Sequence, residues 1–144
     1  MEKEPIHHKR QGRQPLLITN NRFCAEAFSN RCDFLFEESW NYGQVLTAAR
    51  DYVHKGYHLL SHPQYGSLKP NQTPYKSLLL TMHCLDKQDK FASLLLIEQA
   101  LAVYDKFQNM HPTPPWPSKV LEDFRIVDLS LMQSVFERLP LIAL

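Results

Sequence analysis

The sequence predicts a single α/β domain in three layers, with a mostly parallel central sheet of four or five strands flanked by helices. Three observations predict it. The chain of 144 residues has the length of one compact domain. Short, continuous apolar runs have the pattern of buried central strands. Between residues 32 and 61 a helical pattern separates two strand-like segments, which is typical of a parallel crossover unit.

The first elements follow a polar N-terminus. Residues 1–13 carry mixed charge without periodicity, so we expect a mobile tail before a domain that spans 14–144. "PLLIT" (15–19) is expected to be the first strand. A short helix over 22–30 and an aromatic strand, "CDFLFE" (32–37), should follow it.

The clearest helix is predicted from about residue 42 to residue 55. Asn41 has the position of an N-cap, with Gln44 three residues later as its reciprocal partner. Gly56 supplies the left-handed position after the last turn. "YHLLS" (57–61) is then expected to be a strand parallel to the one at 32–37.

The second half of the chain contains a further strand and long helices. "KSLLLTMHC" (76–84) reads as a fourth strand, and a wide apolar face predicts the longest helix over about 87–108. "NMHPTPPWPS" is expected to be a rigid connector. Residues 119–129 fit a strand or a helix equally well, whereas the Ser130 and Gln133 capping pair predicts a helix after them.

The composition argues against a nucleic-acid-binding protein and against a membrane protein. The chain is 44% hydrophobic and 22% charged with a formal net charge of +1, so it has no overall field for nucleic acid or an anionic membrane. No apolar run approaches the roughly 20 residues of a membrane span, and the N-terminus lacks the hydrophobic region of a secretory signal. We therefore expect a cytoplasmic protein that binds neither nucleic acid nor membrane.

The familiar catalytic and cofactor motifs are missing. The four glycines are too far apart for a phosphate-binding loop, and neither a G-x-S-x-G elbow nor H-E-x-x-H occurs. The three cysteines form no C-x-x-C and are expected to be reduced, buried thiols rather than disulfides or metal ligands. No catalytic residue, metal site or cofactor follows from the sequence.

A binding site is expected at the carboxyl ends of the parallel strands, where loops converge in open α/β sheets. The strands at 15–19, 32–37 and 57–61 would release "TNNR", "EESWN" and "SHPQYG" at one edge, and the long segment 61–76 starts there. Its three prolines restrict the backbone, which favours a shaped binding loop over a disordered connection, although a purely structural loop is the alternative. The candidate ligand-binding residues are Asn20, Asn21, Ser61, His62, Ser67, Lys69, Asn71, Tyr75 and Lys76.

Two segments carry a family resemblance. "LLITNN" (16–21) and "VLTAARDYVHKGYHLLSHPQYGSLKPNQTPYKSLLL" (45–80) resemble the GrdX family, and the likeness extends over about residues 15–108. Genes of this family accompany the glycine, sarcosine and betaine reductase systems of anaerobic amino-acid-fermenting bacteria. The family has no assigned activity, so the resemblance implies no catalytic residue.

Two functional hypotheses follow. The first is a non-catalytic accessory protein of such a reductase system that binds a small anionic metabolite or a reductase-complex subunit through loop 61–76. The alternative is a small enzyme acting on a small carboxylate or acyl phosphate, with His62 as acid/base and Lys69 or Lys76 holding the anion. Both hypotheses are compatible with a homo-oligomer.

Overall fold

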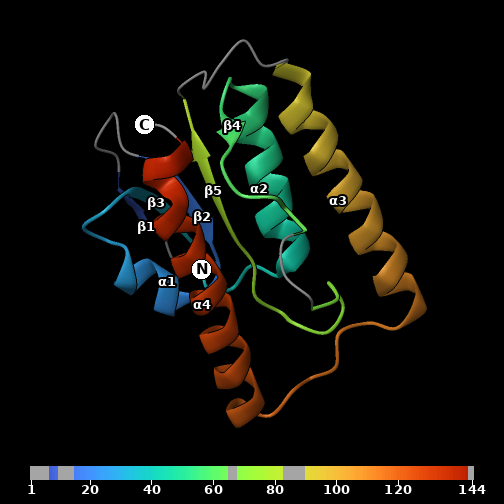
Figure 1. Ribbon diagram of the computed structural model, residues 1–144. Coiled ribbons are helices and arrows are strands. Elements are labelled where there is room, and N and C mark those ends of the chain that lie inside the picture. The colour runs from blue at the N-terminus through green and yellow to red at the C-terminus, as the bar shows by residue number, and fades with distance from the viewer. Residues whose placement is uncertain (1–6, 10–14, 65–67, 83–89, 143–144) are drawn as a thin grey trace, which may run out of the picture.

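The computed structural model describes residues 7–9, 15–64, 68–82 and 90–142. Within these ranges the chain forms one five-stranded sheet and four helices (Figure 1). The strands are β1 (His7–Lys9), β2 (Leu16–Thr19), β3 (Asp33–Phe36), β4 (His58–Leu59) and β5 (Ser77–Thr81). The helices are α1 (Arg22–Ala27), α2 (Tyr42–His54), α3 (Lys90–Met110) and α4 (Ser118–Ile142).

The sheet is mixed, so the expectation of a mostly parallel sheet is wrong. Its strand order is β1–β3–β2–β5–β4, and β2–β3 is the parallel pair, whereas β5 runs antiparallel to both of its neighbours. The three strands expected to be parallel, β2, β3 and β4, do point the same way. The error concerns the direction of β5. If β5 were parallel to β4, the chain would have to return along the sheet to the end where β4 begins, usually through a helix. The described residues of the β4–β5 connection contain no such helix.

The N-terminal segment contributes to one edge of the sheet. Residues 7–9, which lie in the segment expected to be a tail, pair as β1 antiparallel to β3. The predicted helix at 42–55 is confirmed as α2, with the Asn41–Gln44 capping box in place. Gly56 follows it with a φ of +110°, the left-handed conformation that glycine adopts most easily.

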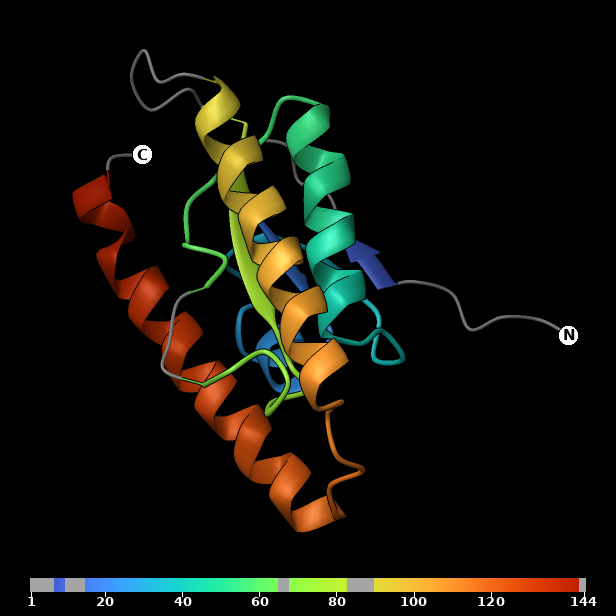
Figure 2. The same ribbon diagram turned by 90° about the vertical axis from the view of Figure 1, so that its right-hand side faces the viewer.

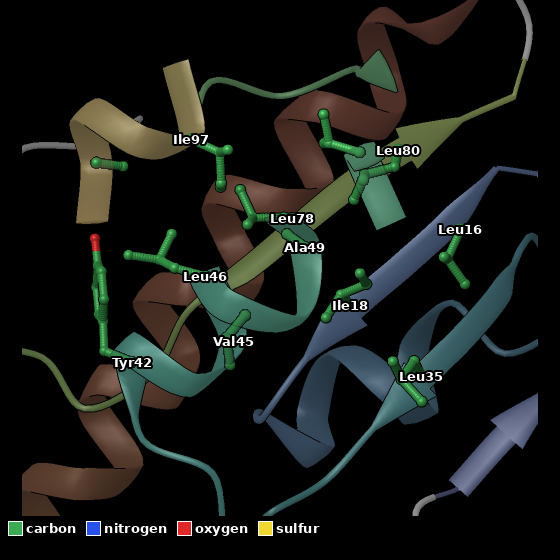
Figure 3. Packing of buried hydrophobic residues seen from close by; sticks show 12 residues of the cluster. Leu16, Ile18, Leu35, Tyr42, Val45, Leu46, Ala49, Leu78, Leu80 and Ile97 are labelled. Carbon is green, nitrogen blue, oxygen red and sulfur yellow. The ribbon is translucent and has the colours of Figure 1, made fainter. Parts of the chain in front are cut away.

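Helices pack on both faces of the sheet (Figure 2). One face carries Leu16, Ile18 and Leu78 against α2 and α3, as Figure 3 shows. On the other face Leu17 and Leu79 contact a cluster built from α1, the turn after it and α4. Because side chains of β2 and β5 are buried on both faces, these strands read as continuous apolar runs.

The ambiguous segment 119–129 is helical and belongs to α4, which continues to Ile142. Ile126 and Val127, whose β-branched side chains favour a strand, are exposed on this helix. The buried side chains Asp128, Met132, Val135 and Phe136 recur at helical spacing. In the described part of the chain, no helix has both the length and the apolar character that a membrane span requires.

Candidate functional site

Buried polar side chains gather at the edge of the sheet where β2 ends and β5 begins. Thr19, the last residue of β2, pairs with Ser77, the first residue of β5. Asp128 joins them from α4, which packs on one face of the sheet. We call this set the edge cluster, and its buried members are Thr19, Asn20, Asn21, Lys76, Ser77 and Asp128.

Asn20 ties three segments of backbone together. Its Nδ2 donates to the carbonyl oxygens of Trp40 (2.8 Å) and Pro74 (2.9 Å), and its Oδ1 accepts from the backbone N–H of Lys76 (3.0 Å). Both amide hydrogens of Asn20 are therefore used within the protein. The side chain holds the end of loop 61–76 against β2 and the β3–α2 connection.

Asp128 is the centre of the edge cluster. Its Oδ2 accepts hydrogen bonds from Ser77 Oγ (2.6 Å) and Asn21 Nδ2 (3.0 Å). Asn21 also caps α1, because its Oδ1 accepts from the backbone N–H of Phe23 (3.0 Å). A buried carboxylate needs such donors in place of water, so these bonds fix α4 relative to α1 and β5.

Cys24 lies beside this carboxylate, with Sγ 3.5 Å from Asp128 Oδ2. Burial, reinforced by the negative charge of Asp128, raises the pKa of the Cys24 thiol far above its ordinary value. The thiol is therefore protonated at neutral pH and is not a ready nucleophile. Cys24 and Cys32 are both buried thiols, as the sequence predicts for them, whereas Cys84 lies outside the described residues.

Lys76 is the buried lysine of the edge cluster. Only 6% of the residue is exposed, and burial lowers its pKa to about 8, although the nearby Asp128 opposes this shift. Its Nζ lies 5.5 Å from the centre of the Tyr42 ring. Among the residues that the structure describes, none accepts a hydrogen bond from Nζ or forms an ion pair with it.

A small cavity of about 20 Å³ adjoins this lysine, and we call it the polar cavity. That volume is enough for about one water molecule. Asp128 and Tyr42 lie in its wall together with Lys76. The remaining lining residues are Leu68, Thr73, Tyr75 and Leu131. The edge of the sheet thus offers a buried cation beside a polar space.

A comparison with protein families gives a match over most of the chain. A family model described as GrdX-like protein matches residues 16–137. The chain belongs to the GrdX-like family. Comparison with curated proteins and with solved structures gives no match.

The family match covers all of the edge cluster, including Asp128. It extends beyond residue 108, where the resemblance seen in the sequence ended, and includes most of α4.

The structure separates the predicted site residues into groups. Asn20, Asn21, Tyr75 and Lys76 come together at the start of β5. Ser61 is buried beside the middle of β5, where its Oγ accepts from the backbone N–H of Leu79 (3.0 Å). Ser67 lies outside the described residues.

The other predicted residues lie on the outer part of loop 61–76. His62 is exposed, and its Nδ1 accepts from the backbone N–H of Gln64 (3.0 Å). Lys69 is also exposed. Asn71 Nδ2 donates to the carbonyl oxygen of His111 (2.8 Å), just after the end of α3. The outer loop is thus bound to the 111–117 connector, a contact that Trp116 extends by donating from Nε1 to the carbonyl oxygen of Gln72 (2.7 Å).

Sequence reasoning missed Asp128 and Tyr42 as parts of this site. Asp128 lies on the buried face of α4, between apolar residues at helical spacing, and a carboxylate in such a position is a recognisable signal. The sequence alone leaves residues 119–129 between strand and helix, so the buried face that carries Asp128 is not evident from it. Tyr42 gave no signal, since an aromatic residue in the first turn of a helix is ordinary core.

In the ranges that the structure describes, no group of three or more His, Cys, Asp or Glu side chains lies in a position to hold a metal ion. What the cluster offers chemically is the Lys76 ammonium group beside the Asp128 carboxylate, whose Oδ2 already accepts hydrogen bonds from Ser77 and Asn21.

Proposed function

We propose that this protein is a non-catalytic accessory protein of an anaerobic glycine, sarcosine or betaine reductase system, and that it binds a small anionic metabolite at the edge cluster. The reductase association rests on membership of the GrdX-like family. The binding role rests on the end of loop 61–76, where Lys76 lies. A reductase subunit bound through the same loop is the competing ligand.

One observation carries the binding proposal, namely the burial of Lys76, a residue that is only 6% exposed. Removing an ammonium group from water costs several kcal/mol unless an anion or good acceptors replace the water. The described residues give Nζ no such partner, while the polar cavity lies next to it. An anion in that cavity would accept hydrogen bonds from Nζ and add to the negative charge that Asp128 already supplies, and burial would strengthen its attraction to the ammonium group.

A thermal-shift experiment tests the proposal, since a ligand that binds only the folded state raises the melting temperature. The ligands are glycine, sarcosine, betaine, phosphate and acetyl phosphate. We expect at least one to raise the melting temperature of the wild-type protein and of Lys119→Met, which removes an exposed lysine on α4. The shift should disappear in Lys76→Met.

Two outcomes would overturn the metabolite site. One is the absence of any shift in the wild-type protein, and the other is an equal shift in Lys76→Met. If the wild-type protein shows no shift but co-purifies with a reductase subunit, the subunit takes the place of the metabolite as the ligand.

The alternative function, an enzyme with His62 as acid/base, gains no specific support. His62 is exposed, and its Nδ1 is occupied by the N–H of Gln64. It is not among the residues that line the polar cavity. A positioned base would need to reach the bound anion, so we do not propose this role.

A further inference from the structure

A second cavity lies between the outer part of loop 61–76 and α3. Its volume is about 180 Å³, and we call it the apolar cavity. Most of its wall is hydrophobic or aromatic, with Gln64 and Lys69 as the polar exceptions. The apolar lining residues are Tyr42, Leu68, Pro70, Ala100, Val103 and Phe107.

The polar and apolar cavities are neighbours. Tyr42 and Leu68 line both of them. Tyr42 lies in the first turn of α2, and its ring points from that helix toward α3 (Figure 3). A molecule that passes these two side chains would have one end beside Lys76 and the other against α3.

The site has two hydrogen-bond donors without a partner in the described part of the chain. One is Lys76 Nζ beside the polar cavity, and the other is the Tyr42 hydroxyl, at the end of the ring that points toward α3 (Figure 3). Burial, followed by the charge of Asp128, raises the pKa of Tyr42 well above its ordinary value, so the hydroxyl keeps its proton and donates. Two donors of this kind suit the two oxygens of a carboxylate.

The size and charge of the polar cavity restrict the headgroup. A space of about 20 Å³ admits little more than the oxygens of a small group. Asp128 lies in the same wall and repels a second negative charge. A headgroup with a single charge is therefore favoured over a phosphate dianion or a dicarboxylate.

The volume and lining of the apolar cavity indicate the size and polarity of the rest of the ligand. Its volume is similar to that of an apolar cavity of about 150 Å³ that holds benzene. Each methylene group moved from water into such a space strengthens binding by roughly fourfold. A chain of about three to five carbons would fill it. Lys69 at the wall is exposed and hydrated, so a carboxylate gains less there than at Lys76.

We propose that the site binds a monocarboxylate with a short alkyl chain, the carboxylate between Lys76 and the Tyr42 hydroxyl and the chain in the apolar cavity. This inference rests on the proposed function, because it names the class of anion that the same site takes.

Calorimetric titration of the full chain with acetate, propionate, butyrate and valerate tests the chain-length dependence. Butyramide and phosphate serve as the uncharged and the doubly charged controls. We expect affinity to rise by roughly fourfold for each methylene group as far as butyrate or valerate. Butyramide and phosphate should bind more weakly than butyrate.

Three variants locate the two ends of the ligand. Lys76→Met should abolish binding of the whole series, and Tyr42→Phe should weaken it at every chain length. Val103→Phe fills the apolar cavity, so it should remove the gain from longer chains and leave acetate binding in place. Val127→Phe, at an exposed position on α4, is the matched control and should bind like the wild-type protein.

The outcomes separate this inference from the proposed function. If acetate and butyrate bind equally well and both depend on Lys76, the anion site stands and the apolar-chain inference is wrong. Tighter binding of phosphate than of butyrate would also overturn the inference. If no anion binds, the proposed function fails together with it. The wild-type series alone decides these cases, even if Val103→Phe does not fold.

Discussion

Lys76 and Asn20 are joined by a hydrogen bond, yet they have different roles. Asn20 uses its amide group entirely on backbone partners, so its burial is matched by hydrogen bonds. Lys76 is buried to a similar degree, but its ammonium group has no acceptor in the part of the chain that the structure describes. At the scale of single residues, Asn20 therefore holds the backbone of the site in place, and the proposed binding of an anion depends on Lys76.

Replacing Lys76 by methionine should change how stability depends on pH. Burial lowers the pKa of Lys76 from 10.5 to about 8 in the folded protein. Between these values the unfolded chain binds the proton and the folded chain does not, so wild-type stability rises with pH. Below about pH 8 the protonated Lys76 lowers the free energy of unfolding by its full amount, which is on the order of 3 kcal/mol. We expect Lys76→Met to be more stable near pH 7.5, with a difference that narrows toward pH 9.5.

Urea denaturation at several pH values between 7.5 and 9.5 measures this difference in the free energy of unfolding. Lys69→Met is the control for the loss of an exposed lysine. Parallel pH curves for the wild-type protein and Lys76→Met would contradict the expectation.

At the scale of elements, α2 and α3 approach each other closely because α2 has a glycine in its first turn. A Cβ atom added at Gly43 would lie 2.5 Å from Cε2 of Tyr104 on α3. The Tyr104 ring is stacked on that of Tyr42, with the ring centres 5.5 Å apart, so a shift of the ring would disturb this stacking. This contact fixes the helix pair at the apolar cavity.

Gly43→Ala should therefore destabilise the protein, although the same change inside an exposed helix adds about 1 kcal/mol of stability. Overpacking costs about 1–3 kcal/mol, so we expect a net loss of about 1–2 kcal/mol. Denaturant unfolding measures it. The control is Tyr104→Leu alone and combined with Gly43→Ala, since the smaller side chain should remove most of the penalty. A loss that persists unchanged in the double variant would argue against the clash as its cause.

Local patterns predicted most of the elements well. The capping box of α2 and the continuous apolar runs of β2 and β5 depend on neighbouring residues, so the sequence shows them directly. The direction of β5 and the helical state of residues 119–129 depend on distant partners. In α4, two exposed β-branched residues obscured a helical spacing that is clear once the buried face is known.

At the scale of the whole molecule, each face of the sheet has its own core. Cys24 and Cys32 both belong to the core on the α1–α4 side, and neither has measurable exposure. Reaching either thiol requires that α4 separates from the sheet. Their reactivity therefore reports the opening of this half of the fold.

Native protein treated with iodoacetamide should consequently be modified slowly at Cys24 and Cys32, and rapidly after unfolding in urea. Peptide mass spectrometry measures each site separately. For Cys24 the raised pKa adds to the protection, because the thiolate is the reactive form. Rapid modification of Cys24 in the native protein would contradict this description of the core.

The sequence by itself determined the family, the α/β class, the position of most elements and the edge of the sheet at which a site is expected. These properties follow from periodicity, capping and motif content, all of which are local in the chain. Only the tertiary structure decided that Asp128, 51 positions after Ser77, enters the cluster, and that Lys76 is buried beside Tyr42. Such contacts join segments far apart in the chain, and their energies depend on burial, which no local pattern specifies.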